Sequence, residues 1–375
     1  MTPPPDPPPN FRPTWPRRRD WRIGCAGAGF IMRDCHLVSY RAAGFNPVAI
    51  ASRNPATARE VAARHGIPAV HDTIDELLDD PAVEILDVAV PPDAQPDLIR
   101  RAVGRGRGRL RGILAQKPLA LTVADAADLV TRCEAAGIVL AVNQNMRFDQ
   151  SVRAAKDILD RGWIGEPVMA TIDMRAVPHW MPWAESLPSL STFVMSIHHL
   201  DTFRYWLGTP DRVLASTRPD PRTRFPHADG INLYILEYDG GARASAWDDV
   251  WAGPSDSVSA SESVEEEQHS IRWRIEGTEG LMRGTIGWPK YPAREPSTLD
   301  YSTRRNPGTW VRPRWDDVWF PDAFAGTMAQ LLVAVEDGTA PEIGGRDNLS
   351  TVALCAAVFA AATEHRVTTV KEFLI

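Results

Sequence analysis

The chain of 375 residues is 44% hydrophobic and 24% charged, with a formal net charge of −7 at pH 7. This composition is typical of a soluble globular protein and excludes a chain that is disordered throughout. The acidic balance argues against a nucleic-acid partner, and no apolar run approaches the roughly 18 residues that a membrane-spanning helix needs. The length predicts two domains, each with its own core.

Cysteines and lysines are few. The cysteines stand at positions 25, 35, 133 and 355, and none forms a CxxC pair. This spacing predicts neither a disulfide framework nor a metal cluster, and we expect a reducing cytoplasm. Only four of the 41 basic residues are lysines, at 117, 156, 290 and 371, so each lysine departs from a strong preference for arginine.

Proline dominates residues 1–20, which we expect to form a proline-rich tail. Eight prolines fall among the first sixteen residues. Each fixes φ and removes a backbone donor, so the segment forms neither a helix nor an inner strand. We expect a solvated tail rather than an arm docked on the protein. The three arginines at 17–19 precede a segment broken by Asp20 and Arg22, which argues against an export signal.

Apolar strand-like runs alternate with helical runs from residue 21 to residue 146. Residues 21–44 predict a strand, a glycine turn and a helix, and residues 47–65 repeat the strand and the helix. A buried strand follows at 83–90 and ends at two prolines. Such alternation predicts an α/β domain with a parallel, doubly wound sheet and right-handed crossovers.

From residue 147 to residue 375 the pattern differs. Several short runs alternate apolar and polar residues, as in residues 233–238 (LYILEY). Such alternation predicts antiparallel strands with one covered face, and therefore an α+β domain. An acidic, serine-rich segment at 254–268 is expected to be a solvated loop. Helices are predicted at 151–162, 196–207, 322–337 and 347–365, and strands at 167–176, 212–218, 231–238, 242–250, 270–276 and 281–286.

A glycine turn lies directly between the first strand and the first helix. Gly27 permits a tight turn, and Gly29 lets the backbone approach a pyrophosphate at the helix N-terminus. Met32 occupies the place of a third glycine, so helix and strand should pack more loosely there. The sequence predicts a dinucleotide site formed by Gly27, Ala28, Gly29, Phe30 and Ile31.

The second strand ends at Ser52 and Arg53, where a carboxylate would bind the ribose 2′-hydroxyl of NAD. The sequence has no carboxylate there. Ser52 can donate a hydrogen bond and Arg53 can pair with a 2′-phosphate, which favours NADP over NAD.

Seven motifs in order resemble one known family. The sequence resembles the Gfo/Idh/MocA oxidoreductases (glucose–fructose oxidoreductase and inositol dehydrogenase) from about residue 21 to its C-terminus. The resemblance implies a Rossmann domain, a C-terminal domain with a large open sheet, and hydride transfer between a nicotinamide and a sugar, polyol or related carbonyl. It also implies a homodimer or homotetramer built through that sheet. The motifs are GAGFI (27–31), ASR (51–53), VAVPP (88–92), QKPLAL (116–121), VNQNMRF (142–148), IHHLDTFRYWLG (197–208) and IEGTEG (275–280).

Lys117 follows a parallel strand and so lies at the carboxyl edge of the sheet, where ligands bind. By resemblance it lies near the nicotinamide and the reacting oxygen. An ammonium there stabilises developing alkoxide charge and can relay a proton, which an arginine cannot do. Gln116 replaces the glutamate that the family usually has, which removes one negative charge beside the amine.

His198 and Asp201 match the family's H-x-x-D on a helix. By resemblance, the histidine is a general acid and base toward the substrate hydroxyl. Inositol-dehydrogenase-like members have an aspartate four residues earlier, where this chain has Val194. His198 can therefore act in proton transfer, or Lys117 can work alone while His198 binds substrate. His199 is the ligand instead if the register differs by one residue.

The remaining candidates rest on the resemblance or on composition. Pro91, Pro92 and Gln95 correspond to cofactor-lining positions of the family. Ten of the thirteen tryptophans lie from Trp180 onward, and sugars pack their C–H faces on aromatic rings. Together with His198, His199 and Asp201, the expected substrate contacts are Arg147, Arg175, His179, Trp180, Trp183, Trp319 and Asp322.

The leading interpretation is an NAD(P)-dependent oxidoreductase of a sugar, sugar acid or cyclitol, with Lys117 and His198 assisting proton transfer. Two alternatives stay open at this point. One is a non-catalytic NADP-binding regulator of the same fold, and the other is a redox-assisted glycosidase. We expect no metal, membrane or nucleic acid among the partners.

Overall fold

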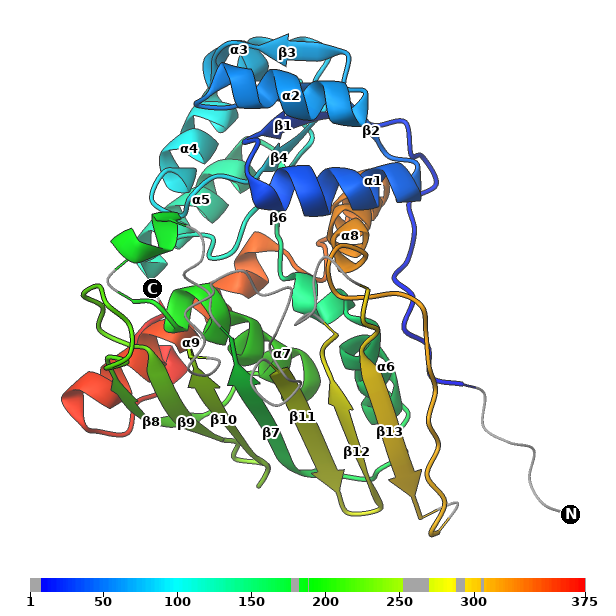
Figure 1. The fold of residues 1–375 in the computed structure, drawn as a ribbon, viewed down its shortest axis with the longest axis vertical. Helices are drawn as coiled ribbons and strands as arrows, with labels where there is room; N and C mark the ends of the chain where they lie inside the picture. The colour runs from blue at the N-terminus through cyan, green and yellow to red at the C-terminus, as the bar shows by residue number, and fades with distance from the viewer. Residues whose placement is uncertain are drawn as a thin grey trace, which may run out of the picture.

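The computed structural model describes residues 8–176, 182–187, 189–251, 270–287, 294–304 and 307–374. Two sheets lie one beyond the other along the longest axis (Figure 1). The first is parallel, with the order β3-β2-β1-β4-β5-β6, which confirms the predicted α/β fold. The three-residue strand β3 was not predicted. The strands are β1 (Arg22–Ala26), β2 (Asn46–Ala51), β3 (Ala69–His71), β4 (Ile85–Val88), β5 (Gly112–Ala115) and β6 (Val139–Val142).

Local sequence signals account for most helices around this sheet. Asn54 caps α2 by accepting a hydrogen bond from Ala56 N at 3.0 Å, and Thr73 and Glu76 form a capping box on α3. The helix after the glycine turn begins with a π-helical turn, which is wider than an α-helical one. The helices are η1 (Ile31–His36), α1 (Leu37–Ala43), α2 (Pro55–His65), α3 (Ile74–Asp79), α4 (Gln95–Arg105), α5 (Val123–Ala135) and η2 (Asn145–Phe148).

The second sheet has seven strands in the order β13-β12-β11-β7-β10-β9-β8. Only β7 and β10 pair in parallel, so the mostly antiparallel prediction is confirmed. Strand β13 was not predicted, and the segment 254–268 lies outside the described residues. The strands are β7 (Pro167–Arg175), β8 (Arg212–Arg218), β9 (Ile231–Glu237), β10 (Arg243–Asp249), β11 (Ser270–Gly277), β12 (Gly280–Thr285) and β13 (Thr298–Thr303).

Helices cover one face of this sheet and leave the other open. Helix α9 packs on β8, α7 on β7, and α6 on β12 and β13. On the open face, apolar side chains 37–48% exposed come from four adjacent strands: Val168, Met169, Leu214, Leu233, Ile235 and Trp247. The elements not yet given are α6 (Gln150–Asp160), η4 (Pro182–Ser186), η5 (Thr192–Ser196), α7 (Ile197–Leu207), α8 (Ala323–Asp337), α9 (Gly345–Glu364) and η6 (Val370–Glu372).

Helix α8 comes late in the chain but packs on the first sheet, against β5 and β6 (Figure 1). A Cβ at Gly112 on β5 would lie 2.9 Å from Leu331 Cδ1, so glycine allows the close approach. After α8, Ile343 accepts a hydrogen bond from Val142 N at 2.8 Å. We propose that residues 21–146 and 147–375 are the two structural units, with α8 of the second completing the core of the first.

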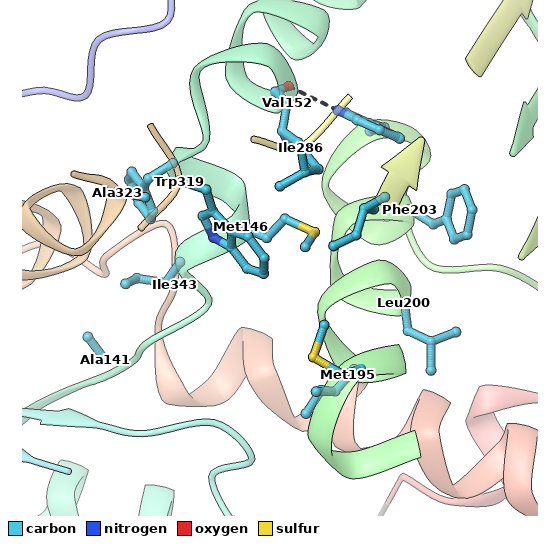
Figure 2. Packing of buried hydrophobic residues seen from close by; sticks show 14 of the residues in the cluster. Ala141, Met146, Val152, Met195, Leu200, Phe203, Ile286, Trp319, Ala323 and Ile343 are labelled. Atoms are coloured by element: carbon cyan, nitrogen blue, oxygen red, sulfur yellow. Dashed lines mark hydrogen bonds between the residues drawn. The ribbon is translucent and has the colours of Figure 1, made fainter. Parts of the chain in front are cut away.

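A continuous apolar cluster joins the two units. Figure 2 shows it running from Ala141 on β6 through Met146 and Trp319 to Met195 and Leu200. Leu200 and Trp319 are at most 1% exposed, and Met195 is 6% exposed. The described helices include none long and apolar enough to cross a membrane.

The N-terminal segment 8–21 lies along the protein surface, so the expectation of a solvated tail is wrong for these residues. Phe11 stacks on Trp315 with ring centroids 5.1 Å apart, and Trp15 packs on Phe45 at 6.0 Å. Glu336 on α8 accepts hydrogen bonds from the main chain of Arg17 at 2.9 Å and of Arg18 at 2.8 Å. The aromatic residues between the prolines therefore hold this segment in place.

Candidate active site

A cleft opens between the two units at the carboxyl edge of the parallel sheet. The segments after β1, β4, β5 and β6 form one wall, and η4, η5, α7 and the loop before α8 form the other. Ligands of doubly wound sheets bind at this edge. The lining residues are Phe30, Ile31, Val90, Pro92, Gln116, Lys117, Asn145, Trp183, Val194, Met195, His198, Trp319 and Phe320.

The two glycines of the turn after β1 have different surroundings. Gly27 has φ +110°, and a Cβ there would lie 2.2 Å from the carbonyl oxygen of Ala89. Only glycine fits this position without moving the backbone. A Cβ at Gly29 would meet no atom within 4 Å. Open space above a main chain that enters a helix suits a pyrophosphate, so these residues fit a dinucleotide.

Lys117 is the cation of the cleft wall. It follows β5, and its Nζ donates a hydrogen bond across the cleft to the carbonyl oxygen of Val194 in η5. Burial lowers the pKa of Lys117 to about 7, and the nearby Cys355 offsets this only in part. A neutral amine is therefore well populated near neutral pH, as a proton-transfer group requires.

His198 lines the cleft from the first turn of α7 and is 3% exposed. Burial, with smaller effects from the charges of Lys117 and His199, holds the pKa of His198 well below its ordinary value. Its Nδ1 has no hydrogen-bond partner among the described residues. The ring stands edge-on to Trp319, whose Nε1 donates to Asn145 Oδ1 at 3.0 Å. The lowered pKa favours the neutral imidazole.

His199 points away from the cleft. Its Nδ1 lies 2.8 Å from Asp248 Oδ1 on β10, and both side chains are fully buried. His198 therefore lines the cleft, and the structure gives His199 a contact with the sheet in place of the expected substrate contact.

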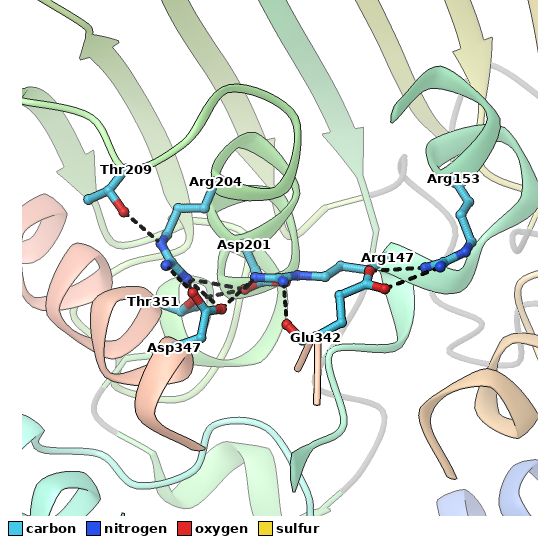
Figure 3. A network of polar contacts seen from close by, with 8 residues as sticks. All are labelled: Arg147, Arg153, Asp201, Arg204, Thr209, Glu342, Asp347 and Thr351. Atoms are coloured by element: carbon cyan, nitrogen blue, oxygen red, sulfur yellow. Dashed lines mark hydrogen bonds and ion pairs between the residues drawn. The ribbon is translucent and has the colours of Figure 1, made fainter. Parts of the chain in front are cut away.

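Arg147 and Asp201 do not line the cleft, contrary to the expected substrate contacts. Arg147 binds both oxygens of Asp201, at 2.6 and 2.7 Å, in the network of polar contacts that Figure 3 shows. Thr351 Oγ1 donates to Asp201 Oδ1 at 2.7 Å, and Arg147 also contacts Asp347 at 3.1 Å. This network joins η2, α7 and α9, and leaves neither group for a substrate.

Other expected substrate residues also have different neighbours. Arg175 lies over the Trp247 ring at 4.8 Å on the open sheet, and Asp322 binds Arg294 and Val318 N outside the cleft lining. His179 and Trp180 lie outside the described residues. Trp183 and Trp319 are the expected aromatic residues that line the cleft.

Some of the expected cofactor residues line the cleft and others do not. Pro92 lines the cleft, whereas Pro91 does not. Gln95 is buried and donates to the carbonyl oxygens of Gln116 at 2.8 Å and Pro118 at 2.9 Å, so it holds the segment that carries Lys117.

At the end of β2, the Ser52 hydroxyl and the main chain of Asn54 form a turn, with 3.0 and 3.1 Å contacts. Arg53 is exposed and makes no ion pair within the described part of the chain. The described residues also include no group of three His, Cys, Asp or Glu that could hold a metal.

Sequence reasoning missed several lining residues. Met195 and Phe320 stand near predicted positions, and Val90 and Asn145 lie within quoted motifs, but no spacing rule singles them out. The one sequence signal that pointed to Phe320 was the aromatic pair at 319–320 next to a proline.

Two family models match the chain. Residues 21–144 match the oxidoreductase family with an NAD-binding Rossmann fold (GFO_IDH_MocA), and residues 152–283 match the GFO/IDH/MocA C-terminal domain. The chain is 25% identical to a D-apiose dehydrogenase of Paraburkholderia graminis, over 93% of this chain and 88% of that protein. It is 26% identical to a D-xylose 1-dehydrogenase (NADP(+)) of Haloferax volcanii, over 91% and 96%.

Solved structures share the fold. An oxidoreductase of Agrobacterium radiobacter in complex with NAD+, L-tartaric acid and magnesium has a TM-score of 0.78 at 21% identity, over 94% of this chain and 99% of that one. A levoglucosan dehydrogenase in complex with NADH and levoglucosan has a TM-score of 0.77 at 19% identity, over the same shares. The chain therefore belongs to the GFO/IDH/MocA family of oxidoreductases and is an enzyme with an NAD-binding Rossmann domain.

Proposed function

We propose that the enzyme oxidises a hydroxyl of a sugar, sugar acid or cyclitol, or reduces the matching carbonyl, with NADP preferred over NAD. The observation that supports this most strongly is the buried Lys117 amine beside His198, at the sheet edge that also carries the glycine turn. Relatives named for D-apiose and D-xylose support a sugar-like substrate.

The glycine turn and Arg53 would hold the dinucleotide. Its pyrophosphate would lie over Gly29, and the exposed Arg53 side chain would pair with a 2′-phosphate. The bound nicotinamide supplies the acceptor or donor of a hydride. The missing carboxylate at the end of β2 supports the preference for NADP.

Lys117 Nζ is the proposed proton acceptor in oxidation and proton donor in reduction. Its amine takes the proton of the substrate hydroxyl when neutral, and the ammonium so formed remains bound to the Val194 carbonyl. His198 is the proposed hydrogen-bond partner of the same hydroxyl, because its lowered pKa favours the neutral ring. The aromatic rings of Trp183 and Trp319 provide faces for the C–H side of a sugar.

A homodimer through the open face of the second sheet is part of the proposal. Six apolar residues of that face are more than a third exposed, and a second copy would cover them. The cytoplasm is the proposed location, since all four cysteines are free and buried.

The deciding experiment is turnover with NADP and with NAD against a panel of sugars, sugar acids and cyclitols, followed by nicotinamide absorbance. We expect turnover in the wild type and its loss in Lys117→Met. A wild type that binds NADP tightly but turns over none of the panel would contradict the proposal and favour a non-catalytic sensor. Turnover that survives in Lys117→Met would contradict the role of the amine.

A further inference from the structure

A buried carboxylate in the parallel sheet has no part in the steps described above. Asp87 lies on the strand β4 and is fully buried. Its Oδ2 lies 2.7 Å from His36 Nδ1 and accepts a hydrogen bond from the Tyr40 hydroxyl at 2.8 Å. Its Oδ1 has no partner among the described residues. A buried charge of this kind costs stability that an apolar residue would not, which points to a role other than stability.

Contacts lead from this carboxylate toward the cleft. Because a carboxylate only accepts, it selects the His36 tautomer with the proton on Nδ1 and the lone pair on Nε2. Asn143, which follows β6, donates from Nδ2 to that Nε2 at 2.9 Å. The same Nδ2 lies 3.4 Å from Gln116 Oε1. His36 and Asn143 are fully buried, so water does not compete for these contacts.

The chain of contacts from Asp87 ends at Lys117, whose side chain carries the amine. Gln116 Oε1 accepts a hydrogen bond from the main-chain N–H of Lys117 at 3.1 Å. On the other side, Gln95 Oε1 accepts from Gln116 N at 2.7 Å. Gln95 therefore fixes the backbone at this point, and the chain of contacts from Asp87 fixes the Gln116 side chain.

We propose that Asp87 and His36 form a positioning dyad that, through Asn143, sets the orientation of the Gln116 amide and thereby the placement of Lys117 in the cleft. The proposal rests on the function proposed above for Lys117. His36 and Asp87 line no part of the cleft, so both are positioning residues.

The chemistry of the amides explains why the tautomer matters. Gln116 Nε2 lies 3.5 Å from His36 Nε2, so both neighbouring amides present N–H groups to that nitrogen. A proton on Nε2 would face these donors, and both amides would have to turn. Gln116 would then present its NH₂ group to the N–H of Lys117, and the contact that holds Lys117 would be lost.

The test uses the small number of lysines in the chain. In full-length protein labelled with ¹³C-lysine, only Lys117, Lys156, Lys290 and Lys371 give side-chain signals, and Lys117→Met assigns the first. Spectra are recorded without cofactor for the wild type, His36→Leu and His36→Gln. Leucine removes the ring nitrogens, whereas glutamine can restore an acceptor for Asn143. Asp87→Asn is the second disruptive variant, because it keeps the volume and removes the charge. Kinetics and NADP affinity are measured on the same samples.

We expect the Lys117 Cε signal to move in His36→Leu and Asp87→Asn, and to stay near the wild-type position in His36→Gln. We expect kcat to fall by about 10-fold in the first two variants, since small displacements of a reacting group have effects of this size or larger. NADP affinity should change by less than about 3-fold, because the glycine turn is untouched.

Two results would overturn the inference. One is an unmoved Lys117 signal and an unchanged kcat in a folded His36→Leu or Asp87→Asn protein. The other is a His36→Gln variant as impaired as His36→Leu, which would indicate a packing role. A wild type without turnover would count against the proposed function alone, because the Lys117 signal still decides whether the dyad positions the amine.

Discussion

The Lys117 amine donates its hydrogen bond to the main-chain carbonyl of Val194, across the cleft between the two structural units. Val194 stands where inositol-dehydrogenase-like sequences have an aspartate. A carbonyl dipole compensates a buried ammonium far less than a carboxylate does, which is why burial governs the pKa of this amine.

This arrangement predicts the pH dependence. The amine must be neutral to accept a proton, so kcat for oxidation should rise with pH through about 7. Val194→Asp adds a carboxylate to the cleft wall and should raise the Lys117 pKa by about 1 unit or more. The rise in kcat should move to higher pH by the same amount, whereas Val194→Asn, which adds no charge, should leave it in place. A profile that is identical in both variants and the wild type would contradict this account.

Lys117→Met should separate activity from stability. Removal of the proton acceptor should lower kcat by roughly 100-fold or more. The same change removes a buried amine whose pKa the fold has lowered from 10.5 to about 7, so the variant should be more stable than the wild type at neutral pH. Thermal unfolding gives the second quantity, with Lys371→Met, at an exposed position of η6, as the control. A lower melting temperature in Lys117→Met would contradict the prediction.

The two glycines of the turn should respond differently to a side chain. Gly29→Val projects into open space, so the fold should persist while NADP binding falls by at least about 10-fold. Gly27→Ala places a Cβ 2.2 Å from the Ala89 carbonyl oxygen at a positive φ, so it should destabilise the fold itself. Circular dichroism melting and cofactor fluorescence measure the two effects. Equal loss of stability in both variants would show that Gly29 is structural.

Arg53→Ala tests the choice of cofactor. Hydrogen bonds to charged groups contribute about 1.5–3 kcal/mol, so loss of a pairing with the 2′-phosphate should weaken NADP binding by about 10-fold or more. NAD lacks this phosphate, and its affinity should stay nearly constant. Arg59→Ala, on the helix α2 that follows Arg53 but paired with Asp72 at 2.6 Å, is the matched control. Parallel loss of both cofactors in Arg53→Ala would exclude the proposed pairing.

Positive charges added to the open face of the second sheet should change the oligomeric state. Leu233 and Ile235 are each 46% exposed in the middle of the apolar face. Leu233→Arg combined with Ile235→Arg should convert a dimer into a monomer, measured by light scattering during gel filtration, because desolvating two guanidinium groups opposes association. Glu60→Arg on α2 adds the same kind of charge at the far end of the molecule and should leave the mass unchanged. A wild type that is monomeric at all concentrations would refute the dimer.

Local patterns predicted both sheets and the glycine turn, and the family resemblance singled out Lys117 and His198, which line the cleft. They failed where the direction of a side chain decides its role. Asp201 follows His198 by three residues, yet successive residues turn by 100°, which leaves the two side chains about 60° apart. That difference is enough for His198 to line the cleft while Asp201 pairs with Arg147 beside it, in the network that joins η2, α7 and α9. An arginine that pairs inside the protein and one that binds a substrate have the same appearance in a sequence.

Two kinds of feature were beyond the reach of sequence patterns. The network from Asp87 to Gln116 joins residues from four separate segments, so it exists only after the sheet has assembled. The docking of residues 8–21 depends on Phe45, Trp315 and Glu336, which are distant in the chain. One signal was visible, since an aspartate within the apolar run of β4 is an unusual place for a charge.

The position of α8 affects the order in which the chain can fold during its synthesis. All six strands of the parallel sheet have been made once residue 142 is complete, but the helix that covers β5 and β6 ends at Asp337. At 5–20 residues per second, the remaining stretch of about 195 residues takes roughly 10 to 40 seconds to translate. During that interval the apolar face around Leu114 and Ala141 lacks the helix that covers it. The nascent cofactor domain therefore depends on the last third of the whole chain, or on a chaperone, to keep that face from water.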